Sequence, residues 1–328
     1  MNLKNRKEKT AKVLNEHWSD IEEVGGNFWH FRVLLWMVRY LPLFLMEICA
    51  AIICFFYWIS APIVRTRSKI YLNHLYKACG KRPKFWGTYY HIFSFGLCLL
   101  EKLRGWNGAV NLKQIETQDD DLKTLVGQLN QGRGAFVLCS HLGNMEMLRS
   151  FTGYKVCHTH RDFHVYPVEN LFVAKKFYRL LRELKSDFLK YVIDANSIGV
   201  NTAIMMKEKI AEGNLVVVAG DRTSANSRNR VIETMFLGEK ANFPEGAFSL
   251  AGILNAPVYF VFAIRKCDFN IRSPYEMHVV RAKTSLDCSR KERSERMKLL
   301  LREYVDLLEK YCKEHPYQWY NFFNFWEK

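Results

Sequence analysis

Short apolar runs rich in β-branched residues alternate with longer amphipathic stretches from about residue 108 onward. The apolar runs are Ala135 to Cys139, Lys190 to Ile193, Leu215 to Ala219 and Pro257 to Ile264. Apolar side chains recur at helical spacing in Asn144 to Phe151, Leu171 to Leu184, Ser197 to Glu212, Glu245 to Leu254 and Ser289 to Lys313. This alternation is typical of a sheet covered by helices. The sequence therefore predicts an α/β fold with a central, mostly parallel or mixed sheet flanked by helices.

An apolar segment precedes this region. Residues 40–64 read YLPLFLMEICAAIICFFYWISAPIV, interrupted by Pro42 and Glu47. The segment has about the length that a helix needs to cross or deeply enter a bilayer. Arg39 before it and Arg65 after it carry charges that favour lipid headgroups. We expect a membrane anchor, with a buried core helix as the alternative. Because both ends are basic, the charges leave open whether the segment spans the membrane or lies in one leaflet.

The remaining N-terminal residues complete a helical region. Residues 1–32 are polar and basic and lack the early apolar core of a cleavable secretory signal. Residues 69–106 are rich in aromatic side chains at helical spacing. We therefore expect a membrane-anchoring helical region over residues 1–107 and an α/β domain over residues 108–328.

Composition limits the class of protein. The 328 residues include 49% hydrophobic residues, enough for a full core, so disorder and a disulfide scaffold are excluded. The nine cysteines form no C-x-x-C pair, which is typical of buried thiols in a reducing compartment. A net charge of +15 attracts anionic lipid, an acidic carrier protein or nucleic acid. We expect the globular part to face the cytosol.

One histidine has the surroundings of a catalytic residue. The run from Ala135 to Cys139 delivers His141 to the carboxyl end of a strand, where open α/β sheets place their ligands. Gly143 supplies a permissive turn and Asn144 a helix cap. Glu146 then falls in the first turn of the next helix and can bend back towards the imidazole.

This arrangement suits a general base. Glu146 would hold one ring nitrogen of His141, while the other takes a proton from a hydroxyl that attacks a carbonyl. A neighbouring carboxylate also raises the pKa of a histidine. Two other pairs share this spacing but lack the strand, glycine turn and helix: His17 with Glu22, and His164 with Glu169. A satisfied polar pair at a helix start is the alternative interpretation.

Other candidates for chemistry are weaker. Cys139 precedes His141 by two residues, a spacing poorly placed for proton transfer along a strand, so we expect a packed core thiol. His158, His160 and His164 have a spacing that a metal could use, but nothing completes the set, and we expect no metal. No nucleotide-binding, α/β-hydrolase or zinc-protease motif occurs, so no cofactor is expected.

Four motifs, in order, resemble those of the late acyltransferases of lipid A biosynthesis, the lauroyl and myristoyl transferases within the glycerophospholipid acyltransferase superfamily. They are S-H-L-G-N-M-E at 140–146, V-V-V-A-G-D-R at 216–222, M-F-L-G-E-K-A at 235–241 and H-P-Y-Q-W at 315–319. Two further features, His17-Trp18 and the R-x-R-S-K-x-Y-L that starts at Arg65, resemble a branch that acylates other envelope glycolipids and aryl polyenes.

The resemblance implies transfer of a fatty acyl group from acyl carrier protein or acyl-CoA to a hydroxyl of a membrane glycolipid, without a covalent acyl-enzyme. It makes His141 the base and Glu146 its partner. Asp221 and Arg222 match a D-Q or D-R element of the family and follow a predicted strand, so we place them at the same sheet edge. With Asn144 they are the expected substrate-binding residues. Arg222 would bind a phosphate or the developing oxyanion, unless it only pairs with Asp221.

The resemblance also implies an inner-membrane enzyme whose catalytic domain faces the cytoplasm. An ornithine or other amino lipid, an aryl polyene, or a non-catalytic lipid-binding role are the alternatives. Basic stretches are plausible docking ground for headgroups and for acidic carrier protein: Lys81 to Lys84, Lys175 to Arg182, Arg228 to Arg230 and Arg290 to Arg296. The aromatic residues from Trp319 to Trp326 lack interleaved basic residues, so no nucleic-acid partner is expected and core packing or a membrane-facing edge is favoured.

Two positions depart from the wider pattern. Where the family often has V-Y-R-P, this chain reads Val165-Tyr166-Pro167, which leaves only Arg161 nearby. F-P-E-G at 243–246 resembles a phosphate-binding motif of glycerol-phosphate acyltransferases, but Ala247 to Leu250 replaces its expected continuation. We interpret F-P-E-G as a helix start.

Overall fold

A seven-stranded sheet forms the centre of the computed structural model, which describes residues 28–106, 115–117, 120–149, 159–170, 190–223, 229–289 and 291–326. The strand order is β1-β9-β8-β2-β5-β3-β4. The strands are β1 (Ile115–Thr117), β2 (Ala135–Cys139), β3 (Val165–Glu169), β4 (Ile193–Asp194), β5 (Leu215–Ala219), β8 (Val258–Arg265) and β9 (Tyr275–Arg281). Only the β8–β9 pairing is antiparallel among these strands. The predicted mostly parallel α/β fold is confirmed.

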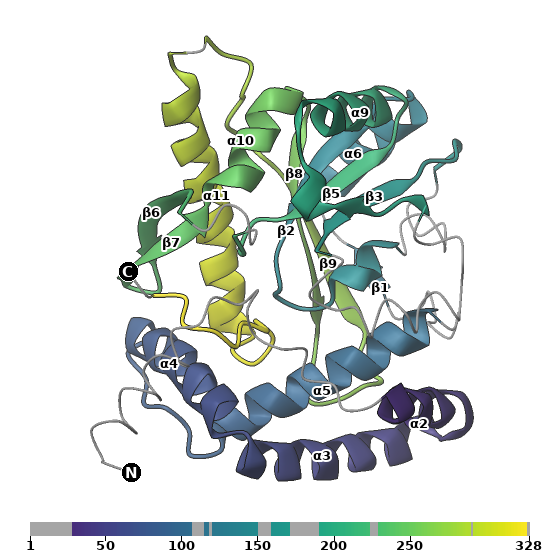
Figure 1. Cartoon of the computed structure of the whole chain (residues 1–328), viewed down its shortest axis with the longest axis vertical. Coiled ribbons are helices and arrows are strands. Elements are labelled where there is room, and N and C mark those ends of the chain that lie inside the picture. The colour runs from purple at the N-terminus through teal and green to yellow at the C-terminus, as the bar shows by residue number, and fades with distance from the viewer. Residues whose placement is uncertain are drawn as a thin grey trace.

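Helices cover both faces because side chains along each strand alternate between two cores. Phe136 and Leu138 of β2 join one core, whereas Val137 and Cys139 join the other. The first core receives α9 (Val200–Ala211), α10 (Glu245–Leu254) and α11 (Arg293–Glu314), and the second receives α6 (Asp120–Asn130). A hairpin of β6 (Val231–Phe236) and β7 (Glu239–Pro244) packs beside α11 (Figure 1).

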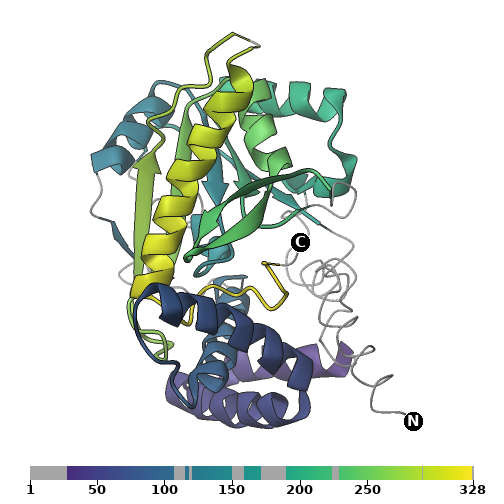
Figure 2. The same cartoon turned by 90° about the vertical axis from the view of Figure 1, so that its left-hand side faces the viewer.

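Four N-terminal helices form a separate layer beside one end of the sheet, visible in both views (Figures 1 and 2). They are α2 (Phe28–Tyr40), α3 (Leu43–Ser60), α4 (Pro62–Ala78) and α5 (Gly87–Trp106). Helices α2, α3 and α5 share a core of their own, whereas buried residues of α4 belong to the core of the sheet. Pro42 and Pro62 divide the predicted apolar segment, so α3 holds 18 of its residues. The domain boundary at residues 107 and 108 stays a prediction.

Three sequence-predicted elements have the expected bounds, and β8, α9 and α11 differ from their predicted bounds by one to four residues at each end. The runs at 135–139, 215–219 and 245–254 match β2, β5 and α10 at both ends, and F-P-E-G leads into α10 as interpreted. The run at 190–193 is wrong for most of its length, since only Ile193 is in a strand. The helix expected from Asn144 is a 3₁₀-helix, η3 (Met145–Arg149). The helix predicted over 171–184 and the basic stretch 175–182 lie outside the described residues.

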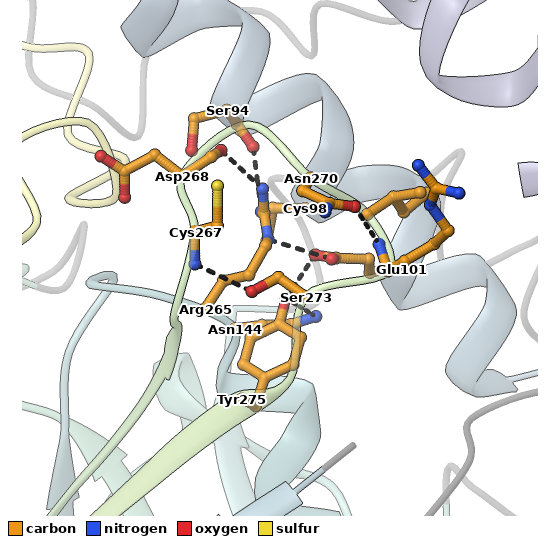
Figure 3. A network of polar contacts seen from close by, with 12 residues as sticks. Ser94, Cys98, Glu101, Asn144, Arg265, Cys267, Asp268, Asn270, Ser273 and Tyr275 are labelled. Carbon is orange, nitrogen blue, oxygen red and sulfur yellow. Dashed lines mark hydrogen bonds and ion pairs between the residues drawn. The ribbon is translucent and has the colours of Figure 1, made fainter. Parts of the chain in front are cut away.

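A buried polar network joins α5 to the sheet (Figure 3). Arg265 at the end of β8 is 0% exposed, and its Nε lies 3.0 Å from Oε1 of Glu101 on α5. Tyr275 of β9 donates to the other Glu101 oxygen. Arg265 also donates to the carbonyl oxygens of Asp268 and Ser94, at 2.8 and 3.4 Å. Two opposite charges inside the protein therefore hold the N-terminal layer against the sheet.

Removal of the acidic partner should be costly. Glu101→Leu leaves the Arg265 guanidinium buried without its counter-charge, and we expect the free energy of unfolding to fall by about 3–5 kcal/mol. Denaturant unfolding in detergent measures the loss. The matched control is Glu116→Gln, which breaks the exposed pair with Lys266 and should cost under about 1 kcal/mol. Equal losses in the free energy of unfolding for the two substitutions would show that the buried pair contributes no more to stability than the exposed one.

Candidate active site

His141 and Asp221 meet because their strands are in-register neighbours. Strands β2 and β5 are parallel, with Cys139 opposite Ala219, and each of the two functional residues follows its strand by two positions. The carboxyl ends of parallel strands share one sheet edge, which is where ligands bind in open α/β sheets. The sequence prediction that His141 and Asp221 share an edge is confirmed.

The Asp221 carboxylate is the electrostatic centre of the site. Its Oδ1 lies 2.7 Å from Nδ1 of His141, and its Oδ2 accepts from the His141 backbone N–H at 2.7 Å. The indole Nε1 of Trp319 donates to Oδ2 at 2.9 Å. Burial raises the pKa of Asp221, but the ring of His141, the charge of Arg222 and the indole outweigh it and leave the pKa lowered. Asp221 is therefore an ionised group that fixes both the backbone and the ring of His141.

The imidazole keeps one nitrogen for chemistry. With Nδ1 on Asp221, Nδ1 carries the proton and Nε2 presents its lone pair. The side chain of His141 is 24% exposed, whereas that of Asp221 is 1% exposed. Burial and the charge of Arg222 lower the pKa of His141, despite the opposing effect of Asp221. A neutral, oriented and reachable imidazole is what a general base requires.

The loop after His141 is locked by backbone pairing on both sides. Gly143 has a φ of +73°, and a side chain there would meet the carbonyl oxygen of Ala263 at 2.0 Å. The Gly143 N–H donates to Gln318 O at 2.9 Å, and the Tyr320 N–H donates to His141 O at 2.9 Å. The tail around Trp319 therefore pairs with the loop after His141 like a short added strand.

The orienting role predicted for Glu146 belongs to Asp221. Glu146 lies in η3, in the first turn after the loop as expected, and its N–H donates to Oδ1 of Asn144 at 3.2 Å. The carboxylate that holds Nδ1 of His141 nevertheless comes from the neighbouring strand end. The correction follows from geometry, because Asp221 follows the in-register neighbouring strand by the same two positions as His141.

The remaining predicted residues separate into two groups. Asn144 is fully buried, and its side chain caps η3 and reaches the hydroxyl of Tyr275, so its geometry gives no support to substrate binding. Arg222 is half-buried beside the site, and its Nη2 donates to Tyr320 O at 2.9 Å. Burial lowers the pKa of Arg222 to about 10, partly opposed by Asp221. Arg222 therefore stays cationic at neutral pH.

Three other candidates gain no support from the described residues. Burial raises the pKa of the Cys139 thiol well above its usual value, as expected of a packed core thiol rather than a nucleophile. Arg161 lies beside Gly132, which precedes the amino end of β2, at the opposite edge from His141. His158 lies outside the described residues, and the ring of His164 stacks on Tyr191 at 4.5 Å. Among the residues described, no group of three potential ligands is arranged for a metal.

The family follows from a match along nearly the whole chain. A family model described as bacterial lipid A biosynthesis acyltransferase matches residues 26–328. The chain belongs to this family. No curated protein sequence matches it significantly. The resemblance inferred from the four motifs is confirmed, and the acyltransferase class with it.

In this member of the family the four motifs converge on one place. The first and second supply His141 and Asp221. The third forms the turn of the β6–β7 hairpin and the strand ends beside it, and its Phe236 ring packs edge-on against Trp319 at 5.3 Å. The fourth supplies Trp319, which donates to Asp221. Sequence reasoning missed the role of Trp319, since it favoured core packing or a membrane-facing edge for the tail and named no partner for the indole N–H.

We expect Asp221→Asn to lower kcat of acyl transfer by about three to four orders of magnitude. The amide would donate to Nδ1 of His141, so the ring proton moves to Nε2 and the base is lost. Glu146→Gln leaves the Nδ1 partner in place and should cost much less. Steady-state rates with an acyl thioester, on variants that keep the wild-type circular dichroism, provide the comparison. A larger loss for Glu146→Gln would return the orienting role to Glu146.

The pH dependence has a defined sign. Because the pKa of His141 is lowered from 6.5, kcat/KM should fall only as the pH drops through a value below 6.5, where the base becomes protonated. Arg222 contributes to that lowering, so Arg222→Gln should move the acid limb to higher pH. A pH–rate profile of the two proteins tests this. An acid limb that stays in place would remove Arg222 from the electrostatics of the base.

Proposed function

We propose that the protein transfers a fatty acyl chain from acyl carrier protein or acyl-CoA to a hydroxyl of a lipid A precursor or a related envelope glycolipid. The carrying observation is the His141–Asp221 pair at the carboxyl edge of the sheet, which occupies Nδ1 and leaves Nε2 to a side chain that is 24% exposed. Family membership supports the acyltransferase class and the lipid A context.

The reaction begins with removal of a proton. Nε2 of His141 accepts the proton of the acceptor hydroxyl, and the oxygen forms a bond to the thioester carbonyl carbon. The imidazolium that results is stabilised by the ionised Asp221 at 2.7 Å. A thioester needs little further activation, so position and deprotonation supply much of the rate.

Collapse of the intermediate completes the transfer. The negative charge on the former carbonyl oxygen is stabilised by Arg222, the half-buried cation beside the pair. The carbon–sulfur bond then breaks, and the imidazolium returns the proton to the leaving thiolate. The products are the acylated glycolipid and the free thiol of the carrier, with no acyl-enzyme.

Glu146 keeps a second, weaker role in the proposal. It lies on the first turn of η3, and η3 packs against α5. Lys102 of α5 makes a small contribution, after burial and Arg222, to the lowered pKa of His141. We assign Glu146 to positioning the acceptor hydroxyl near Nε2 rather than to holding the ring.

The partners follow from charge and compartment. Exposed basic residues on the turn between α4 and α5, Lys81, Arg82 and Lys84, suit an acidic carrier protein or anionic headgroups. The cysteines in the described part of the chain are free thiols, which favours the cytoplasmic side of the inner membrane. No cofactor, metal or nucleic acid enters the reaction.

We expect His141→Ala to lower acyl transfer by several orders of magnitude without unfolding the domain. The imidazole is the proposed proton acceptor, whereas the fold is stabilised by two hydrophobic cores that do not include His141. Purified protein, an acyl thioester and a glycolipid acceptor give the rate directly. Near-normal transfer by folded His141→Ala would refute the mechanism, and absence of turnover by the wild type with every thioester would favour a lipid-binding protein.

Mass spectrometry of lipids from a deletion strain identifies the acceptor. Loss of one secondary acyl chain from lipid A, restored by the wild-type gene and not by His141→Ala, is the expected result. Unchanged lipid A together with loss of an acylated ornithine lipid or aryl polyene would transfer the same chemistry to that acceptor.

A further inference from the structure

Helix α3 has one face inside the protein and one face outside it. Only Met46, Ala50 and Cys54 of its 18 residues are buried, all on one face at a spacing of four. The outer face is apolar and exposed. Its large exposed side chains are Phe44, Ile48, Ile52, Ile53, Phe55, Phe56 and Ile59. Length and composition alone would let this helix cross a membrane.

The inner face is attached along its whole length. Glu47, the one charged residue of α3, accepts from the Ile271 N–H of the β8–β9 loop at 3.2 Å. In the middle, Tyr89 of α5 donates to Ala51 O at 3.2 Å. Near the end, Trp58 Nε1 donates to Thr88 Oγ1 of α5 at 2.9 Å. Helix α3 is therefore hydrogen-bonded to the β8–β9 loop near its start and to α5 in its middle and near its end.

Helix α5 in turn cannot leave the sheet. Its Glu101 pairs with Arg265 inside the network of Figure 3. Its His91 lies 2.8 Å from Trp319 O, next to the site. If α3 crossed a bilayer, α5 would enter the hydrocarbon beside it and carry this ion pair and the sheet edge with it. Buried charges and strand edges are not tolerated in contact with lipid.

Aromatic and basic side chains flank the outer face at both ends. Trp36, Tyr40 and Arg39 are exposed on α2, just before α3. At the other end, Trp86 lies 5.5 Å from Trp58, ring to ring, and Phe85 beside it is 86% exposed. The exposed basic residues of the α4–α5 turn, Lys81, Arg82 and Lys84, directly precede Phe85 and Trp86 in the chain. Amphipathic rings and cations around an apolar strip match the boundary between acyl chains and anionic headgroups.

We propose that α3 lies in the plane of an anionic phospholipid bilayer, with its outer face immersed in the cytoplasmic leaflet and its inner face carrying the catalytic domain. The apolar face of such a helix is buried about 5–10 Å deep, at the boundary between the headgroups and the acyl chains. Both of its ends then lie on the same side of the membrane. This inference goes beyond the proposed reaction and does not depend on it.

A binding experiment tests the outer face. Full-length protein is floated with vesicles of phosphatidylethanolamine and phosphatidylglycerol. Ile48→Glu/Ile52→Glu should lose about tenfold or more in vesicle affinity, since it places two charges in the leaflet. The control, Ile204→Glu/Leu299→Glu on α9 and α11, changes two side chains that are each as exposed as Ile52, at 53%, and should bind like the wild type. Ile48→Ser/Ile52→Ser, which adds no charge, serves if the glutamates prevent folding.

A topology experiment separates an in-plane helix from a spanning one. An epitope tag at the N-terminus should resist protease in intact spheroplasts and be cleaved in inverted membrane vesicles, as a C-terminal tag should be. Cleavage of the N-terminal tag alone in spheroplasts would overturn the proposal in favour of a spanning helix. Equal loss of vesicle binding in both variant pairs, or none in either, would also overturn it.

Two further readouts complete the test. If the outer face instead covered a second copy of the chain, Ile48→Glu/Ile52→Glu would convert a dimer to a monomer in size-exclusion chromatography and leave vesicle binding unchanged, which overturns the lipid assignment. Transfer to a detergent-dispersed acceptor should persist in this variant. If the wild type itself transfers no acyl chain to this acceptor, the proposed reaction is rejected. The vesicle-binding measurement still decides the placement of α3.

Discussion

The carboxylate of Asp221 is the constraint on which the site depends. Two of the hydrogen bonds that it accepts fix the backbone and the ring of His141, and a third, from Trp319, comes from a distant part of the chain. An ionised group inside a protein is stable only when its acceptor positions are filled. The sheet register, the loop and the tail therefore have to be correct together for the ring of His141 to be held in its orientation.

The same tail connects the site to the helical layer. His91 on α5 lies 2.8 Å from Trp319 O, and its Nδ1 lies 2.9 Å from the hydroxyl of Ser68 on α4. Burial lowers the pKa of His91 to about 4, so the ring is neutral at physiological pH and serves as a structural link. The layer that we place on the membrane and the residue that holds Asp221 are thus one hydrogen bond apart.

The sequence predicts the parts of the fold with a strong local signal. Strands β2 and β5 are continuous apolar runs buried on both faces, and α10 has a clear apolar face, so their bounds match. Strand β9 was missed because Glu276 and His278 interrupt its apolar positions. His141, Asp221 and Arg222 could be placed at one edge, since each follows a strand. Whether Glu146 or Asp221 contacts the imidazole of His141 depends on which strands are neighbours in the sheet. The pattern of residues along the chain does not contain that strand order.

The pairing of residues 318–320 with the loop after His141 also sets an order of events. Gln318 and Tyr320 hold that loop, and Trp319 completes the shell around the carboxylate, yet these residues follow every strand of the sheet in the chain. A nascent polypeptide that has already folded its sheet still lacks a competent base. The orientation of His141 is therefore complete only once residues 318–320 have paired with the loop that follows it.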